Sequence, residues 1–477
     1  MSSKITLIGK THQRCLNSYK HKRRLKMSLN YKPSKYTYYF FDEDNNMFMY
    51  NFLIGKRSLC IVPQDKQTKV LSIIKSENIF EYNNMSNELL NILYIKGFII
   101  NIEENELLKL QDLYMSKVMD NRLAITILPT EQCNFRCPYC YEDHKKGTMS
   151  KETQIGLLKF IQKNISKYDS LHVGWFGGEP LIALEVVQFL SENMMKICEN
   201  NNKVYSSNMT TNGYNLNLDT FKKLYKLKVF SYQITLDGLE DKHNLQRYLC
   251  DGSPTFKKIV KNLLEISNEL EKVKSNANIM IRTNFSKDNI VNLNELIKFY
   301  GENFAKSKLF TFLFRSVGNY GGNTINLMQG KMIKDYNLKK VYEMAYNSKY
   351  NFNFANQMRM FEPGGLMCYA SKKNTYVIGS DGNIYKCTCD FEGGLIGNVE
   401  KNGVLQLDDY KHIRWYTKSL NILMEKCSDC KVAPSCLASS CPRKLINNDL
   451  ECKNVFNEEN FQLLLKCENK QKPFFVI

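Results

Sequence analysis

The sequence predicts an α/β protein built on a parallel β-sheet, open or partly closed, with a smaller domain before it and another after it in the chain. Three observations support this prediction. Residues 121–330 alternate strand and helix patterns, short strands and helices precede them from Tyr36, and the alternation stops at Gly364, where cysteines become frequent. Repeated strand–helix units place their strands parallel in one sheet, because each helix carries the chain back across it.

The domain boundaries follow from these changes in pattern. We expect a basic, disordered tail at 1–29, a small domain at 30–115, the strand–helix repeat at 116–330, a bridging segment at 331–363 and a cysteine-rich domain at 364–477. The tail is predicted from a basic run without any apolar period, which cannot form a packed core. Met27 is an alternative start of translation, because patterned sequence begins only after it.

Composition limits the classes of function. The chain has no apolar run near the ~20 residues of a membrane helix and no signal-peptide region at its start. We therefore expect a cytoplasmic protein without a membrane partner. The net charge of +18 comes from lysines spread along the whole chain, which is typical of a solvated surface. It favours an acidic peptide partner over nucleic acid.

The small domain is predicted from short elements separated by polar turns. Its strands are Tyr36–Phe41, Phe48–Leu53, Ser58–Val62 and Phe98–Ile102, and its helices are Ser86–Lys96 and Glu104–Met119. Gly97 follows the first helix, where a glycine commonly ends one. This mixture predicts a winged-helix-like domain. Its role is either to bind a partner or to cap the larger domain.

The central domain is predicted from six strands with helical patterns between them. The strands are Leu123–Leu128, Leu171–Phe176, Lys203–Met209, Val229–Leu236, Ile279–Asn284 and Leu309–Val317, and the helices include Lys151–Tyr168 and Thr255–Lys274. Polar residues follow several of these strands. The carboxyl ends of such strands are where α/β barrels place their chemistry.

Cysteines mark the first of these strand ends. Cys133, Cys137 and Cys140 have the spacing C-x3-C-x2-C directly after the first strand. Three thiolates leave one iron of a [4Fe–4S] cube without a protein ligand, so that iron can bind a small molecule. A zinc site and a redox cysteine cluster are the alternatives. Eleven of the sixteen cysteines lie in 133–140 and 368–452, which favours metal ligation over disulfides.

The spacing, with Tyr139 before the last cysteine, resembles the signature of radical SAM enzymes. The resemblance implies a partial (β/α)6 barrel and a [4Fe–4S] cluster whose open iron binds S-adenosylmethionine (SAM). It also implies reductive cleavage of SAM to a 5′-deoxyadenosyl radical, which abstracts hydrogen from a substrate. A flavodoxin or ferredoxin type of protein would supply the electron.

Further motifs occur in the order that this family shows. The resemblance assigns SAM contacts to the GGEP-like residues Gly177, Gly178 and Glu179, to Asn212 of a TNG turn, to Thr235 in place of the family's usual serine, to Arg282 and to Tyr139. His243 and Arg247 follow the fourth strand, where hydrogen bonding within the protein and contact with substrate are both open.

The cysteine-rich domain resembles the SPASM extension of radical SAM enzymes, although two zinc-binding units would also suit its CxxC-like pairs. The resemblance implies two auxiliary [4Fe–4S] clusters, the first on Cys368, Cys387 and Cys441, the second on Cys427, Cys430, Cys436 and Cys452. No cysteine precedes Cys368 closely. The first cluster is therefore open or recruits Cys389 or Cys60, and Cys467 is an alternative to Cys452.

Taken together, the motifs are similar to those of maturases that modify ribosomally made precursor peptides. In these enzymes the small domain resembles a RiPP recognition element, which adds the precursor's leader as a strand at a sheet edge. The product would carry a thioether, carbon–carbon or ether cross-link, and no side-chain general base is assigned. The rivals are a protein-modifying enzyme similar to anaerobic sulfatase maturases and a non-catalytic iron–sulfur peptide-binding protein.

Overall fold

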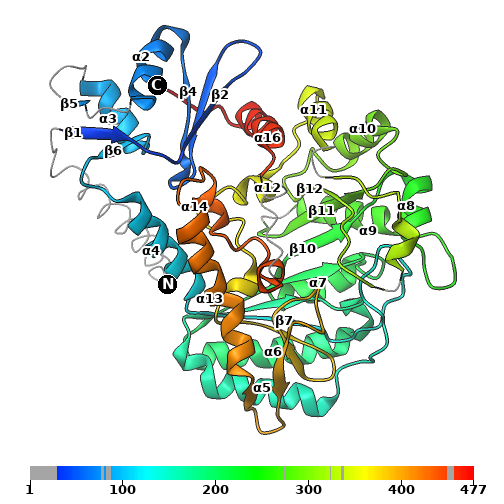
Figure 1. Ribbon diagram of the computed structural model, residues 1–477. Helices are drawn as coiled ribbons and strands as arrows, with labels where there is room; N and C mark the ends of the chain where they lie inside the picture. The colour runs from blue at the N-terminus through cyan, green and yellow to red at the C-terminus, as the bar shows by residue number, and fades with distance from the viewer. Residues whose placement is uncertain are drawn as a thin grey trace, which may run out of the picture. The chain divides into compact units, whose positions relative to one another are not determined.

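The computed structural model describes residues 30–76, 80–81, 87–272, 275–322, 324–334, 338–447 and 456–477. The chain divides into two compact units (Figure 1). The first comprises residues 1–106 together with 475–477, and the second comprises residues 107–474. We call them the N-terminal unit and the main unit. The expected tail and Met27 lie outside the described residues.

Two small sheets form the N-terminal unit. Strands β2 (Thr37–Phe41), β3 (Met47–Asn51) and β4 (Gly55–Val62) run antiparallel, and β17 (Phe475–Val476) pairs in parallel with β4, in the order β17-β4-β3-β2. The second sheet has the order β5-β1-β6, with β1 (Asn30–Pro33), β5 (Phe80–Glu81) and β6 (Ile99–Asn101).

Helices α2 (Gln64–Ile74) and α3 (Asn87–Ile95) complete this unit. Gly97 ends α3 as expected, with a φ of +79° and with Phe98 N–H bonded to Leu93 O at 2.8 Å. The sequence analysis did not predict α2, whose buried residues are only Gln67, Val70 and Ile73. So narrow an apolar stripe is a weak helix signal.

Apolar side chains from both sheets and both helices share one core. Its members are Tyr31, Met47, Met49, Cys60, Val62, Val70, Ile73, Leu89, Leu90, Leu93, Phe98, Ile99 and Ile477. The alternation of side chains along β3 and β4 explains which of their residues enter this core, because Met47 lies opposite Val62 and Met49 opposite Cys60 on one face. Cys60 is therefore a core thiol, and burial raises its pKa to about 12.

The main unit confirms the predicted parallel sheet. Its six parallel strands are β7 (Arg122–Ile127), β8 (Ser170–Trp175), β9 (Val204–Thr211), β10 (Val229–Thr235), β11 (Asn278–Phe285) and β12 (Phe310–Ser316), paired in chain order. Alternate residues of β7, β8 and β9 are buried. Helices follow the strands as the βα pattern requires, and Figure 1 shows them along the sheet.

The helices of the main unit have these bounds: α5 (Lys151–Asn164), α6 (Leu184–Asn200), α7 (Leu218–Lys226), α8 (Glu240–Gln246), α9 (Phe256–Leu270), α10 (Leu293–Asn303), α11 (Lys339–Asn347), α12 (Ala355–Arg359), α13 (Asp409–Lys426), α14 (Ala433–Cys436), α15 (Pro442–Ile446) and α16 (Glu458–Gln471), with α4 (Glu106–Val118) leading into it. Side-chain caps start several of them. Ser150 accepts from Thr153 N–H before α5, and Asp408 accepts from Lys411 N–H before α13. Among the described residues, no helix is long and apolar enough to cross a membrane.

In the sequence, Ser380-Asp-Gly382 predicts a turn between two strands, Thr375–Ile378 and Ile384–Lys386. This hairpin is present, but it belongs to the main sheet. Strand β13 (Thr375–Ile378) pairs in parallel with the outer edge of β7, and β14 (Asn383–Tyr385), β15 (Leu395–Val399) and β16 (Leu405–Leu407) continue it antiparallel. The sequence analysis placed this hairpin in a separate domain because sequence patterns do not show which strand edges meet. The sheet therefore has ten strands.

We predict that Asn51→Ala destabilises the N-terminal unit by about 2–4 kcal/mol. Asn51 is 1% exposed. Its Nδ2 donates to Ser34 Oγ at 2.9 Å and Gly97 O at 2.7 Å, and its Oδ1 accepts from the N–H groups of Leu53 and Ile54. Each lost bond costs about 0.5–1.5 kcal/mol, and buried partners remain unpaired.

Hydrogen exchange of the full chain measures this effect at the amides of residues 30–106. The matched control is Asn91→Ala, since Asn91 is exposed on α3. Equal protection in the two variants would contradict the prediction.

Candidate functional site

The first cysteine loop follows β7 and is closed by hydrogen bonds at its base. Met149 N–H donates to Pro129 O at 2.9 Å, and Gln132 Nε2 donates to the carbonyls of His144 and Lys146 at 2.6 and 2.9 Å. These bonds join the two arms of the loop. The loop therefore has a defined conformation at the carboxyl end of the strand.

The three predicted ligands lie together in this loop and are half-buried. Cys140 N–H donates to Cys137 O at 3.1 Å, and Phe135 N–H donates to Cys133 Sγ at 3.3 Å. Burial raises the pKa of Cys133, and the nearby carboxylate of Glu179 and the other two thiols add to the effect. Thiols that disfavour one another's charge in this way need a cation or a metal to hold them as thiolates.

Three cysteines in this spacing suit an iron–sulfur cube. The cysteines of a cube each bind a different iron atom, and three cysteines satisfy three of the four irons.

Two glycines let the end of β8 lie against the cysteine loop. A Cβ on Gly177, where φ is +111°, would be 2.3 Å from Thr130 O, and one on Gly178 would be 2.3 Å from Gln132 O. The two backbones are also bonded, since Glu179 N–H donates to Gln132 O at 2.9 Å. Only glycine permits this approach.

Glu179 joins the ends of β8 and β9. Its side chain is fully buried, and it accepts from Leu181 N–H at 3.0 Å, from Thr211 Oγ1 at 2.7 Å and from Asn212 N–H at 2.7 Å. Burial raises the pKa of Glu179, and these bonds oppose that effect. A carboxylate has about four acceptor sites, so one site remains for a cationic group.

Asn212 is the link from this network to the cysteines. Its Nδ2 donates to Asn134 Oδ1 at 2.8 Å, and Asn134 follows Cys133 directly. Thr235, the last residue of β10, is the register partner of Arg282 in the second half of β11. The predicted residues therefore lie at or near the carboxyl ends of five successive strands, β7 to β11, as the parallel topology requires.

A buried network that the sequence analysis did not assign lies behind Tyr139. Its hydroxyl donates to Asp237 Oδ2 and accepts from Arg247 Nη1 at 2.8 Å. Asp237 is fully buried and Arg247 is 8% exposed. Arg247 also favours the thiolate of Cys137, opposing the burial that raises the pKa of that thiol. The feature of the sequence that could have indicated this network is Asp237, an aspartate directly after the fourth predicted strand.

His243 has a hydrogen-bonded role inside the protein. Its Nδ1 accepts from Asp237 N–H at 3.2 Å, and its Nε2 lies 3.1 Å from Thr255 Oγ1. Burial lowers the pKa of His243 well below its usual value, and the Arg247 charge adds to this. The imidazole is therefore neutral and holds the loop after β10 in place.

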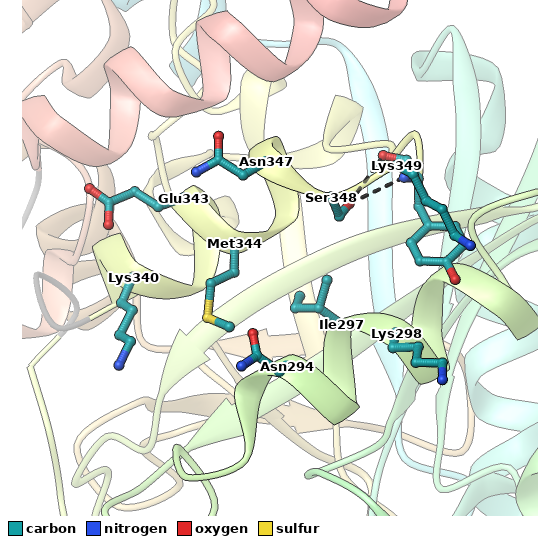
Figure 2. Close-up of a pocket in the computed structure, with 10 residues that line it drawn as sticks. Asn294, Ile297, Lys298, Lys340, Glu343, Met344, Asn347, Ser348 and Lys349 are labelled. Atoms are coloured by element: carbon teal, nitrogen blue, oxygen red, sulfur yellow. Dashed lines mark hydrogen bonds between the residues drawn. The ribbon is translucent and has the colours of Figure 1, made fainter.

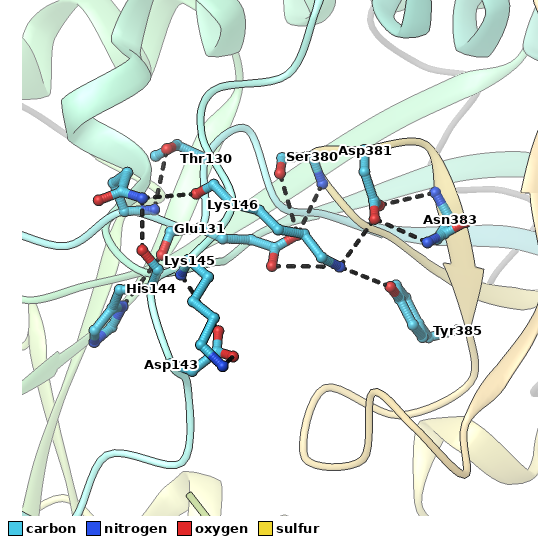
Figure 3. Close-up of polar contacts among 11 residues, drawn as sticks. Thr130, Glu131, Asp143, His144, Lys145, Lys146, Ser380, Asp381, Asn383 and Tyr385 are labelled. Atoms are coloured by element: carbon cyan, nitrogen blue, oxygen red, sulfur yellow. Dashed lines mark hydrogen bonds and ion pairs between the residues drawn. The ribbon is translucent and has the colours of Figure 1, made fainter. Parts of the chain in front are cut away.

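A polar cluster ties the hairpin to the cysteine loop (Figure 3). Glu131 Oε1 accepts from Ser380 N–H at 3.2 Å and from Ser380 Oγ at 3.1 Å. Lys146 Nζ pairs with Asp381 at 2.9 Å and donates to Tyr385 OH at 3.0 Å. Because Cys387 follows Tyr385 closely, this cluster brings the second cysteine group towards the first.

Four cysteines form that second group. Tyr369 OH accepts from Thr388 N–H at 2.8 Å, which places Cys368 beside the segment of Cys387 and Cys389. Burial, together with the nearby thiols of Cys441 and Cys389, raises the pKa of Cys368 to about 11. Cys389 N–H donates to Cys387 Sγ at 3.3 Å.

The remaining cysteines are placed only in part. Cys430 N–H donates to Cys427 O at 3.1 Å at the end of α13, and Cys436 lies in the short helix α14. Cys452 lies outside the described residues. Cys467 is 5% exposed within α16, and its membership of any cluster stays a prediction.

A cavity of about 520 Å³ lies elsewhere in the main unit (Figure 2). It is lined by residues of α10 and α11 and of the segment after them, including Lys298, Lys340, Glu343 and Tyr350. None of the predicted site residues lines it. We therefore place the chemistry at the strand ends and not in this cavity.

Comparisons with known proteins show which families the chain is similar to. Residues 127–297 match the model of the Radical SAM superfamily. The chain is 23% identical over 442 residues to the radical SAM cyclopropyl synthase TigE of Paramaledivibacter caminithermalis, covering 84% of this chain and 88% of that protein. It is 25% identical over 384 residues to the cysteine-type anaerobic sulfatase-maturating enzyme of Clostridium perfringens, covering 74% and 95%.

The solved structure of native anSMEcpe with bound AdoMet and Cp18Cys peptide has a similar fold. The TM-score is 0.52 with 20% identity, over 74% of this chain and 97% of that one. The likeness agrees with a partial barrel. The chain contains a radical SAM domain and is a radical SAM enzyme, and the cofactors of this family are a [4Fe–4S] cluster and SAM.

We predict that Gly178→Ala lowers the iron bound at the first cysteine loop. The added methyl would meet the carbonyl oxygen and carbon of Gln132 at 2.3 and 2.5 Å, and backbone atoms cannot rotate away. The loop must shift, and the thiols with it. Iron analysis and the absorbance of the anaerobically reconstituted enzyme measure the loss.

Gly147→Ala is the matched control, because a Cβ at Gly147 meets nothing within 4 Å. If both variants bind wild-type amounts of iron, the close contact between Gly178 and Gln132 does not position the cysteine loop.

Proposed function

We propose that this enzyme modifies a ribosomally made precursor peptide, installing a thioether, carbon–carbon or ether link. The observation that carries the proposal is a half-buried three-cysteine loop at the strand ends, in a chain that also has a separate unit with sheet edges. The relatives support a peptide or protein substrate. One is named a sulfatase-maturating enzyme, and the anSMEcpe structure holds a peptide.

The strand ends supply groups of the right chemistry for SAM. The fourth acceptor site of Glu179 suits the ammonium group, and the half-buried guanidinium of Arg282 suits the carboxylate. Thr235 offers a hydroxyl for the ribose, and Gly177 and Gly178 present backbone instead of side chains. When bound, the cluster and SAM supply the radical that abstracts hydrogen from the substrate.

Tyr139, Asp237 and Arg247 hold the far side of the cysteine loop. Asp237 and Arg247 balance each other's charge, so the buried network adds little net charge beside Cys137. A paired and hydrogen-bonded arrangement is what keeps buried charges tolerable. These side chains orient the loop and exclude water; they are positioning residues.

The second cysteine group supports an auxiliary cluster with four protein ligands. We propose that Cys368, Cys387, Cys389 and Cys441 bind the first auxiliary [4Fe–4S] cluster, and that Cys427, Cys430, Cys436 and Cys452 bind the second. Cys389 lies beside Cys387 and also near Cys368, whereas Cys60 belongs to the core of the N-terminal unit. Of the alternatives that the sequence left open, we therefore propose Cys389 as the fourth ligand of the first auxiliary cluster.

The N-terminal unit is proposed to bind the leader of the precursor at a sheet edge, and the alternative is a structural cap. Edge strands present unpaired backbone groups that an extended peptide can satisfy. The net charge of +18 favours an acidic leader. A flavodoxin or ferredoxin type of protein is the proposed electron donor.

The proposal is tested by removing the first cluster. Replacing Cys133, Cys137 and Cys140 together by Ala should abolish formation of 5′-deoxyadenosine while auxiliary iron remains, because each cluster has its own ligand group. Chromatography of the reaction products and iron analysis measure the two effects. Complete loss of iron from a folded triple variant would falsify the assignment of separate sites.

The four-ligand assignment predicts a difference between two single variants. Cys389→Ala should lower the iron per chain and change the electron paramagnetic resonance signal of one reduced cluster. The signal of the SAM cluster should stay unchanged. Cys250→Ala is the control, since Cys250 is exposed and lies outside both groups. Identical spectra for the two variants would exclude Cys389 as a ligand.

A further inference from the structure

The last residues of the sequence complete the first sheet of the N-terminal unit. In β17, Phe475 lies opposite Cys60 and Val476 opposite Ile61, in parallel with β4. Ile477 N–H donates to Ile61 O at 3.0 Å, and Lys66 Nζ donates to Ile477 O at 3.1 Å. A segment more than four hundred residues away in sequence thus occupies a sheet edge whose own strands come from residues 37–62.

One side chain of this segment enters the core. Ile477 is 6% exposed and belongs to the cluster that includes Cys60, Val70 and Leu93, whereas Phe475 and Val476 are 52% and 56% exposed. Main-chain bonds plus one buried aliphatic side chain are the mode by which an extended peptide is added to a sheet. The edge of β4 therefore already works as a peptide site, with the chain's own residues as ligand.

The segment leaves much of the edge of β4 without a strand. Strand β4 has eight residues, and among the described residues β17 pairs with two of them, Cys60 and Ile61. Further along, the carbonyls of Arg57 and Leu59 accept from Lys96 Nζ at 2.9 and 3.1 Å. A longer peptide can replace this ammonium with ladder bonds, because a lysine side chain moves at little cost.

Two lysines flank the bound segment. Lys66 contacts Ile477 from α2, and the Lys96 ammonium lies 5.1 Å from the centre of the Phe475 ring. The edge of β4 thus offers an apolar core contact, where Ile477 lies, and two cations, one of them against an aromatic ring of the bound segment. That combination fits an acidic peptide with alternating apolar residues.

We infer that the edge of β4 is the peptide-binding site of this enzyme and that residues 475–477 occupy it as an internal ligand, which the substrate peptide must displace. The identity of that peptide as a precursor leader rests on the proposed function. Three residues, 472–474, connect the segment to α16, so the segment competes at the high effective concentration of a short tether. The apparent affinity for an added peptide is the intrinsic affinity multiplied by the fraction of sites that the segment leaves free.

The test uses the full chain and a variant that lacks residues 475–477. The probe is a fluorescein-labelled synthetic peptide with the sequence of residues 470–477. Fluorescence anisotropy measures its binding. The truncated enzyme should bind the probe saturably, with an affinity at least 10-fold higher than that of the intact enzyme. Val404→Ser in the intact chain is the control and should behave as wild type, because Val404 is an exposed residue of the main unit.

Equal binding to the intact and truncated enzymes, or binding to neither, overturns the inference. If the truncated chain does not fold, hydrogen exchange of the intact enzyme decides instead. Saturating probe should speed exchange at 475–477 and leave β4 protected. Unchanged exchange at 475–477 while probe is bound places the peptide elsewhere, such as at the β2 edge.

These outcomes are separate from those of the proposed function. The probe carries no reacting residue, and neither measurement needs the cluster or SAM turnover. Failure of the displacement experiment leaves the radical chemistry untouched, and failure of peptide modification leaves the displacement result standing.

Discussion

Strand β7 is hydrogen-bonded on both edges, and the arrangement of both cysteine groups depends on this. Strand β8 pairs with one edge and β13 with the other, both in parallel. The cysteine loop leaves the carboxyl end of β7, and the hairpin that leads to Cys387 turns at the same end of β13. The cluster of Glu131, Lys146 and Ser380 then joins the loop to the hairpin. The two cysteine groups therefore lie at one edge of the sheet.

Two sets of contacts hold the cysteine loop at different points along it. Near its start, Gly177 and Gly178 contact the backbone of residues 130–132 so closely that no side chain would fit. Near its last cysteine, Asp237 and Arg247 hold Tyr139. The loop therefore has a defined conformation over the stretch that carries the three thiols. Preorganisation of this kind is how a protein tunes a cofactor whose chemistry it does not itself perform.

The N-terminal unit shows how a sheet edge can be protected and yet remain usable. An exposed edge strand pairs readily with other chains, and proteins cover such edges. Here the cover is two residues long and is fixed by one buried side chain. A cover this small leaves backbone groups for a longer ligand. In the displacement that we propose, this short cover also sets the affinity of the edge for an added peptide.

The sequence by itself determined the features that depend on local spacing. The C-x3-C-x2-C loop, the polar residues after successive strands, the parallel sheet and the turn at Gly382 were all predicted, because their signals lie within a few residues of one another. Only the tertiary structure decided which distant segments meet. It brought Cys389 and Cys441 to Cys368, joined β13 to β7 and placed Ile477 in the core of the N-terminal unit. The physical reason is that a thiol or a strand edge carries no mark of its partner in the sequence. Its partner is chosen by how the folded layers pack.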